Sequence, residues 1–267
     1  MPRAVSSVTA VMVVRDRCPS RTLLDGLADA LGALAADFNV VIVANGTANE
    51  VSLELKSLVA TVADLTVVFL GLRQHDDIAR LVGIDQAIGD FVLFCTPTEA
   101  EIASLPNLLA PLSDDYDLVV GAPPQASEQT ESLPMRASFR AFQALFRRLT
   151  GFAFETRPTG FRVLSRAAAL YVATNALGEV LIRGLSLGPG FPATVVALPE
   201  PPAARPDTPL SDRMSRALRL LLTSSALPLR LSSFIGLAGG FLSLLYAVYV
   251  ACVYLLKPDV QAGWTTL

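Results

Sequence analysis

The sequence has few of the residues that build disulfide frameworks, zinc sites and redox centres. Its 267 residues include three cysteines, one histidine and one tryptophan. No CxxC pair is present and Cys252 lies in an apolar run, so we expect a reduced compartment without a disulfide framework or a cysteine-based metal site. Charged residues make up only 17% of the chain and the net charge is −3, which argues against non-specific binding of nucleic acid.

Hydrophobic residues, by contrast, are abundant, and the longest run without a charge covers residues 231–256. A helix of about 20 apolar residues crosses the hydrocarbon core of a bilayer, so this run predicts a transmembrane helix. The alternative is a fully buried helix of a soluble domain. Gly236 and Gly240 fall on one face of the run, where small residues allow close packing against a partner helix or a second copy of the chain.

Basic residues gather before the apolar run, and only Lys257 follows it. Those before it are Arg213, Arg216, Arg219 and Arg230. By the positive-inside rule this asymmetry places the preceding domain on the cytoplasmic side of the inner membrane. The sequence therefore predicts a globular domain at 1–200, a linker with an interfacial amphipathic helix at 201–230, the span at 231–256 and a loop at 257–267.

The first half of the chain alternates short apolar segments with amphipathic ones. The segments typical of buried strands are 8–14, 38–43, 66–70, 91–95 and 117–120. The segments typical of helices are 23–34, 50–62, 77–88 and 105–112, with further helices at 138–149 and from 167. This alternation predicts an α/β domain with a mostly parallel sheet covered by helices on both faces.

Ligands of such sheets bind beyond the carboxyl ends of the strands. The segments that follow the expected strands are 15–18, 44–49, 72–77 and 95–101. Two arginines near the end of the third strand, Arg73 and Arg80, are candidate donors to a diphosphate. His75, Asp76 and Asp77 also lie here and could form a base with a carboxylate that orients it, but capping of the next helix by Asp76 and Asp77 is favoured over a catalytic role.

Several short motifs carry a resemblance to a known family. They are GIDQAIGD at 83–90, GFRVLSR at 160–166, IRGL at 182–185, PLRL at 228–231 and GWTTL at 263–267. With the order of elements, they resemble the family 2 glycosyltransferases of the polyprenyl-phosphate type, which include dolichol-phosphate mannose synthase. The resemblance implies a GT-A fold, a nucleotide-sugar donor, a divalent metal (Mg²⁺ or Mn²⁺), a polyprenyl-phosphate acceptor and a role at the cell envelope.

The chain departs from that family where the family places its acids. Asn45, Gly46 and Thr47 stand where the family has an Asp-Asp-Gly-Ser turn, and with Arg73 they are the expected nucleotide-binding region. Cys95-Thr96-Pro97 stands in place of an Asp-x-Asp metal motif, and proline offers no donor atom to a metal. We therefore expect no cofactor unless other acids replace these.

Glu99 and Glu101 are the candidate replacements. They would serve as catalytic or metal-binding carboxylates at the end of the fourth strand, or else they begin the following helix and stabilise its N-terminus. Only the first arrangement would hold Mg²⁺ or Mn²⁺.

Arginines further along the chain are candidates for a second kind of site. Arg136, Arg140, Arg162 and Arg166 would bind lipid phosphate or diphosphate, or else they serve solubility and attraction to anionic headgroups. Two functions stay open: a non-catalytic relative that binds lipid phosphate or a protein partner, and an active, metal-independent polyprenyl-phosphate glycosyltransferase. The coordinated loss of the acidic motifs favours the first.

Overall fold

A computed structural model gives the fold of the chain, which divides into two units, Met1–Pro209 and Leu210–Leu267. The structure describes residues 5–96, 98–122, 144, 160–175, 177–184, 186–188, 190–198 and 227–256. The expected helix at 138–149, apart from residue 144, and the expected linker and interfacial helix at 201–230, apart from residues 227–230, lie outside the described residues. The two units are described separately below.

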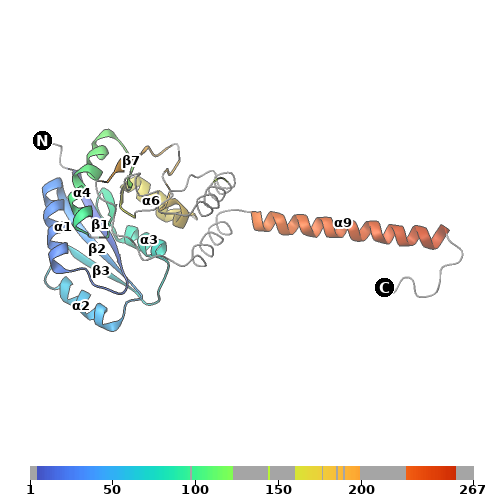
Figure 1. The fold of residues 1–267 in the computed structure, drawn as a ribbon, viewed down its shortest axis with the longest axis horizontal. Helices are drawn as coiled ribbons and strands as arrows, with labels where there is room; N and C mark the ends of the chain where they lie inside the picture. Colours follow the sequence, from blue (N-terminus) through green and yellow to red (C-terminus); the bar gives the residue numbers. More distant parts are fainter. Residues whose placement is uncertain are drawn as a thin grey trace, which may run out of the picture. The chain divides into compact units, whose positions relative to one another are not determined.

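The first unit is built on a seven-stranded sheet in the order β3-β2-β1-β4-β6-β5-β7 (Figure 1). Its strands are β1 (Val5–Val14), β2 (Ala35–Asn45), β3 (Leu65–Leu70), β4 (Phe91–Phe94), β5 (Leu118–Ala122), β6 (Arg162–Ser165) and β7 (Ala193–Ala197). Only β6 runs antiparallel to its neighbours, β4 and β5, among the described strands. The predicted mostly parallel α/β sheet is confirmed.

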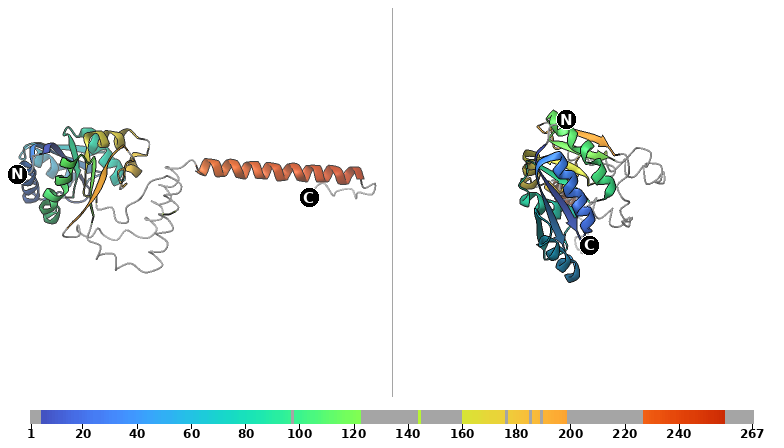
Figure 2. Two further views of the ribbon diagram at one scale, coloured as in Figure 1. Left: turned by 90° about the horizontal axis from the view of Figure 1, so that it is seen from above. Right: turned by 90° about the vertical axis from the view of Figure 1, so that its left-hand side faces the viewer.

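Helices cover both faces of this sheet, as predicted (Figure 2). The core on one face includes side chains of α1 (Arg21–Leu34), α2 (Asn49–Val59) and α4 (Glu99–Leu109). The core on the other face includes side chains of α3 (Asp76–Gln86), α6 (Arg166–Thr174) and α7 (Gly178–Leu181). Strand β1 contributes side chains to both cores, because Ala10 and Met12 point to the first and Val11 to the second.

Gly83 fixes how closely α3 lies over the sheet. A Cβ atom at this position would overlap the Cγ1 atom of Val11 on β1, so only glycine permits the approach. The first turn of α3 is thereby held near the carboxyl end of β1. This turn carries Asp76 and Asp77.

Three elements differ from the sequence predictions. Helix α4 begins at Glu99 rather than at residue 105, because the Thr98 side chain caps it by accepting a hydrogen bond from the Glu101 amide at 3.2 Å. The segment Arg162–Ser165, before the expected helix from 167, forms β6, a four-residue strand whose first three residues are buried. Strand β7 was not predicted, since it is short and Val195 at its centre is half exposed.

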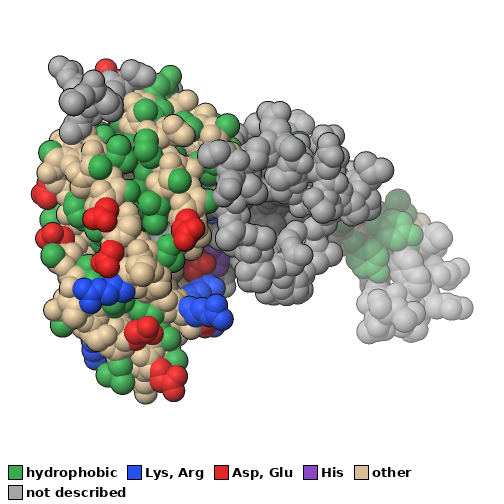
Figure 3. All heavy atoms as spheres, turned by 60° about the vertical axis from the view of Figure 1, so that its left-hand side comes forward, with side chains coloured by type: hydrophobic (Ala, Val, Ile, Leu, Met, Phe, Trp, Pro, Cys, Tyr) green, Lys and Arg blue, Asp and Glu red, His purple; other side chains and the backbone are tan. Residues whose placement is uncertain are grey.

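The surface of the first unit mixes all side-chain types on the face drawn in Figure 3. Acidic and basic side chains lie interspersed among hydrophobic and polar ones there. This is the composition of an ordinary solvated surface. Charge alone therefore marks no binding region on that face.

The second unit contains α9 (Leu227–Leu256), an apolar helix of 30 residues. Its segment Ser232–Val253 has a mean hydropathy of 1.9 and is long enough to cross a membrane, and it is the one such helix in the described part of the chain. Large side chains such as Phe234, Leu237 and Leu245 are exposed along it. An apolar surface of this extent is unfavourable in water, which suggests association with a membrane.

Candidate functional site

The carboxyl ends of β1, β2, β3 and β4 meet at one edge of the sheet, because these four strands are parallel. Ligands of parallel α/β sheets bind at this edge, where loops and helix starts converge. Here the edge is formed by Arg15 after β1, Asn45 at the end of β2, the segment 71–75 after β3, and Cys95 with Thr96 after β4.

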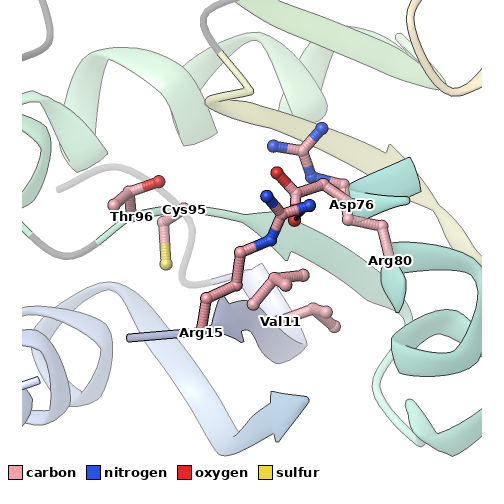
Figure 4. Close-up of a pocket in the computed structure, with 7 residues that line it drawn as sticks. Val11, Arg15, Asp76, Arg80, Cys95 and Thr96 are labelled. Atoms are coloured by element: carbon pink, nitrogen blue, oxygen red, sulfur yellow. Dashed lines mark ion pairs between the residues drawn. The ribbon is translucent and has the colours of Figure 1, made fainter. Parts of the chain in front are cut away.

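A pocket of about 170 Å³ opens at this edge. Its lining residues are Val11, Val13, Arg15, Asp76, Arg80, Cys95 and Thr96. Figure 4 shows the charged groups of Arg15, Asp76 and Arg80 gathered at one side of the pocket, with Cys95 and Thr96 at the other. Its volume is below the roughly 300–1,000 Å³ of pockets that enclose drug-sized ligands, so it suits a small charged group.

The Arg15 and Asp76 side chains form an ion pair in this pocket, with Nη2 2.6 Å from Oδ1. Both side chains are about one third exposed. The two groups are close, but they are not aligned for a hydrogen bond. Asp76 Oδ1 and Arg15 Nε are both buried, and neither has a hydrogen-bond partner among the described residues. The attraction between the two groups is therefore mainly electrostatic, and part of their hydrogen-bonding capacity is unused.

Asp77, the next residue, lies in a very different environment. It is 1% exposed and is surrounded by cationic or hydrogen-bonding groups. Arg183 Nε lies 2.5 Å from Oδ2, His75 Nδ1 lies 3.0 Å from the same oxygen, and Arg80 Nη1 lies 3.2 Å from Oδ1. Burial alone would raise the pKa of Asp77, but the hydrogen bond with His75 and the charges of Arg183 and Arg80 outweigh it and hold the pKa well below 3.8.

This cluster joins distant parts of the chain at the pocket wall. Arg183 follows α7 and lies 106 residues from Asp77 in sequence. Arg80 lines the pocket while its guanidinium contacts the Asp77 carboxylate. Asp77 is therefore a buried anchor that positions Arg80.

The expected nucleotide-binding region after β2 is closely packed against the loop after β3. Asn45 is fully buried: its Nδ2 donates to the Gln74 carbonyl at 2.9 Å, and its Oδ1 accepts from the Gln74 amide at 2.7 Å. Gly46 has φ +61°, and a Cβ there would lie 2.6 Å from Arg73 Cα. The side chain of Asn45 thus holds two loops together, because both of its hydrogen-bonding groups are used.

The other two residues of that region lie nearer the surface. The hydroxyls of Thr47 and Ser52 are hydrogen-bonded at 2.8 Å, at the start of α2. Arg73 is more than half exposed, and its Nη2 lies 3.6 Å from Asp16 Oδ2. Of the expected region, Arg73 carries the only charge.

Glu101 is buried in the first turn of α4, and Glu99 is exposed in the same turn. The Oε2 atom of Glu101 accepts a hydrogen bond from the Thr96 amide at 2.7 Å. This contact ties the loop after β4 to the helix N-terminus, where a negative charge is favourable. Burial raises the pKa of the neighbouring Cys95 thiol, and the Glu101 charge raises it further, so this cysteine is a neutral wall of the pocket.

A divalent metal does not fit the donors at this edge. Among the residues that the structure describes, no three His, Cys, Asp or Glu side chains are grouped as metal ligands. Asp76 lies against Arg15, Asp77 lies among three other side chains, and Glu101 accepts from a backbone amide. Two guanidinium groups in the pocket would also repel a cation.

Two of the arginines expected to bind lipid phosphate, Arg162 and Arg166, are not among the residues that line this pocket. Arg162 is 2% exposed, and its Nη1 donates to the carbonyls of Ile182 at 2.6 Å and Gly184 at 3.2 Å. Arg166 Nη1 donates to the Ala87 carbonyl. The buried guanidinium of Arg162 therefore braces β6 against the segment 182–184.

Arg136 and Arg140 lie outside the described residues. Sequence reasoning did not single out Arg15 or Arg183. Arg15 had a signal, since it comes directly after a buried strand of a parallel sheet, in one of the segments expected at the binding edge. Arg183 stood in the IRGL motif at 182–185, but nothing pointed to its role, because its partner Asp77 is remote in sequence.

No protein-family model matches the chain, and no curated protein sequence matches it. Solved structures do match it in fold. Glucosyl-3-phosphoglycerate synthase from Mycobacterium tuberculosis is 14% identical, with a TM-score of 0.52 over 82% of this chain and 79% of that chain. A second crystal structure, of a mycobacterial protein, is 16% identical, with a TM-score of 0.54 over 82% of this chain and 73% of that one.

A further structure holds the same synthase in complex with Mn²⁺, UDP-glucose and phosphoglyceric acid. It is 14% identical, with a TM-score of 0.48 over 82% of this chain and 78% of that chain. Identities this low establish the fold alone. The chain has an α/β domain with the fold of GT-A-type nucleotide-sugar transferases, as the sequence resemblance implied.

Proposed function

We propose that this chain is a membrane-anchored, non-catalytic relative of the polyprenyl-phosphate glycosyltransferases that binds the phosphate group of a lipid carrier. One observation carries the proposal. The carboxylates of Asp76, Asp77 and Glu101 at the binding edge are engaged in internal contacts, while Arg15 and Arg80 line the pocket. This donor set favours an anionic ligand over a metal.

The chemistry of sugar transfer supports the non-catalytic assignment. A nucleotide-diphosphate leaving group develops negative charge that has to be stabilised in the transition state. The family that the sequence resembles uses a metal held by acids for this purpose, and this chain has Cys95 and Thr96 at that position. No catalytic step is therefore assigned to Glu99 or Glu101.

The location proposed for the protein is the cytoplasmic side of the inner membrane. The apolar helix α9 supports anchoring, and the excess of basic residues before it supports that orientation. Arg136, Arg140 and Arg166 are proposed as further contacts to lipid phosphate. A protein partner or a second copy of the chain is proposed to pack on α9 through Gly236 and Gly240.

The second candidate is an active, metal-independent transferase. It is favoured by the presence of Arg15 and Arg80 in one pocket, because guanidinium groups can stabilise the charge of a leaving diphosphate. In that case the nucleotide sugar would be a substrate, and its nucleotide would bind at the region formed by Asn45, Gly46, Thr47 and Arg73.

An activity assay separates the two candidates. The full chain in detergent is incubated with undecaprenyl phosphate and radiolabelled UDP-glucose or GDP-mannose, in Mn²⁺ or in EDTA. We expect no labelled lipid under either condition. Transfer that requires Mn²⁺ would contradict the proposal, and transfer in EDTA would establish the alternative.

A binding assay tests the lipid-phosphate ligand directly. Farnesyl phosphate and farnesol form a matched pair that differs only in the phosphate group. We expect saturable binding of farnesyl phosphate to the full chain in detergent and none of farnesol at the same concentrations. Equal binding of both would show that only the apolar tail is recognised.

A further inference from the structure

Two buried polar atoms in the pocket lack hydrogen-bond partners among the described residues. Arg15 Nε is a donor with nothing to donate to, and Asp76 Oδ1 is an acceptor beside Arg15 without an aligned hydrogen bond. A buried polar group left unsatisfied costs about 1–3 kcal/mol, so such groups are rare in folded proteins. Both atoms belong to the one ion pair that lines the pocket.

The charges around these atoms favour an anion. Three guanidinium groups, those of Arg15, Arg80 and Arg183, lie against the two carboxylates of Asp76 and Asp77. Within this group of ion pairs the guanidinium groups outnumber the carboxylates by one. Asp77 is occupied by His75, Arg80 and Arg183, so the less firmly held carboxylate is that of Asp76.

The size and geometry of the pocket favour a phosphate group. A guanidinium group presents Nε and Nη as a planar fork, which matches two oxygens of a phosphate. About 170 Å³ accommodates one phosphate group or inorganic pyrophosphate, whereas a whole nucleotide sugar would extend beyond it. The apolar floor formed by Val11 and Val13 lowers the local dielectric and strengthens the attraction.

We propose that this pocket is a metal-free phosphate site in which Asp76 is a displaceable counter-ion. Asp76 holds Arg15 in the unliganded protein, and an incoming phosphate group takes the Arg15 fork, including its Nε, as Asp76 turns away. Arg80, positioned by Asp77, supplies the second cation. This site rests on the proposed function only for the source of the phosphate, which is a lipid phosphate or a nucleotide diphosphate.

This arrangement predicts that removal of one carboxylate at the site, that of Asp76, increases the affinity for phosphate. Asp76→Asn removes the competitor for Arg15 and a like charge beside the phosphate, so it should tighten binding. A carboxylate that held a metal at the same site would behave in the opposite way, because its loss would weaken metal-dependent binding. A gain in affinity also cannot be produced by misfolding.

The test is calorimetric titration of the full chain in detergent with inorganic pyrophosphate, in EDTA. We expect Asp76→Asn to lower Kd by about tenfold and Arg15→Gln to raise it by at least about tenfold. Asp16→Asn is the matched control, because Asp16 is an exposed aspartate at the same edge that lies near Arg73. It should change Kd by less than about threefold.

Two results would overturn the proposal. One is an Asp76→Asn variant that binds pyrophosphate no better than the wild type. The other is equal tightening by Asp16→Asn, which would reduce the effect to the general charge of the edge. An Arg15→Lys variant keeps the charge and loses the fork, and binding as tight as wild type would contradict recognition by the guanidinium.

Two further titrations identify the source of the phosphate. If farnesyl phosphate shows the same tightening in Asp76→Asn, the site takes lipid phosphate; if UDP shows it instead, the site takes a nucleotide diphosphate. In the second case the proposed lipid-binding function fails and the pocket assignment stands. Weaker binding of all three probes by Asp76→Asn would overturn the pocket assignment, even if farnesyl phosphate still binds the protein.

Discussion

The first turn of α3 holds two consecutive aspartates whose side chains lie in opposite environments. On one side Asp77 is buried and contacts His75, Arg80 and Arg183. On the other side Asp76 is partly exposed, contacts Arg15 alone among the described ion pairs, and has an oxygen without an aligned hydrogen bond. Consecutive residues on a helix point about 100° apart, so one aspartate enters the core and the other faces the pocket.

The two aspartates divide the charged groups of this region into a buried structural cluster around Asp77 and a pocket-lining ion pair of Asp76 and Arg15. A buried carboxylate surrounded by cations is costly to unpair, so Asp77 fixes the position of its partners. A half-exposed pair is weak and easily exchanged for another ion, so Asp76 can yield Arg15 to a ligand. The same residue type therefore has a structural role at one position and, in the proposed phosphate site, the role of a displaceable counter-ion at the next.

The largest expected effect is the loss of the buried charge. Asp77→Asn leaves the Arg183 and Arg80 guanidinium groups without their counter-ion and should lower the free energy of unfolding by about 3–5 kcal/mol. Denaturant unfolding of the full chain in detergent measures it. Asp85→Asn, at an exposed position of the same helix, is the control and should change stability by less than about 0.5 kcal/mol. Equal effects of the two variants would remove the distinction.

The dependence of stability on acidic pH should also reveal the buried, ion-paired carboxylate of Asp77. The folded pKa of Asp77 is depressed below 3.8, so its stabilisation is present above that value and is lost as the pH falls through it toward the folded pKa. The wild type should therefore lose stability steeply below about pH 4, and Asp77→Asn should lose less over the same interval. Unfolding midpoints measured from pH 6 to pH 3 test this, and parallel curves would contradict it.

A smaller loss of stability is expected from Gly46, which follows β2 and packs against the loop after β3 that carries His75. Gly46→Ala places a Cβ 2.6 Å from Arg73 Cα at φ +61°, so it should cost about 1–3 kcal/mol and loosen the loop after β3. Gly71→Ala is the matched control, because a Cβ there meets nothing within 4 Å. Thermal unfolding in detergent compares them. Similar midpoints for both variants would show that the two loops are not tightly joined.

The smallest effect is expected at Glu101, the third carboxylate of the edge. Glu101→Gln keeps an oxygen that can accept from the Thr96 amide and loses the charge at the helix N-terminus, so it should cost about 1 kcal/mol. Glu99→Gln, at the exposed position of the same turn, should cost less. Titration with Mn²⁺ should give the same weak response for wild type and the double variant. A Mn²⁺ affinity lost in the double variant would place a metal here.

The sheet could be predicted from the sequence because its strands are apolar runs that alternate with amphipathic helices. The binding edge followed from the parallel order, and segment 15–18 was correctly placed at it. Strand β7 could not be predicted, since half-exposed Val195 interrupts any buried pattern. The start of α4 at Glu99 agrees with the alternative in which Glu99 and Glu101 begin the helix, whereas the apolar spacing alone placed the start at residue 105, because the first turn is polar and the interior contains Pro106.

The pairing of charges was beyond sequence reasoning. Asp76 and Asp77 are identical in sequence terms, and capping of α3 was expected of both. The N-cap position is instead occupied by His75, whose Nδ1 lies 3.0 Å from Asp77 Oδ2. Only the fold brings Arg183 to Asp77 and Arg15 to Asp76, across 106 and 61 positions respectively. Arg162 illustrates the same limit, because burial turned a candidate phosphate ligand into an internal brace.

The most direct test of the central claim is the metal dependence of ligand binding by the wild-type chain. Calorimetric titration of the full chain in detergent with UDP and with farnesyl phosphate is carried out in EDTA and again in Mn²⁺. An arginine site predicts that at least one of these phosphate ligands binds, with a Kd that differs by less than about twofold between the two conditions. Binding that appears only with Mn²⁺ would contradict the account and return the carboxylates of Glu99 and Glu101 to the role of metal ligands.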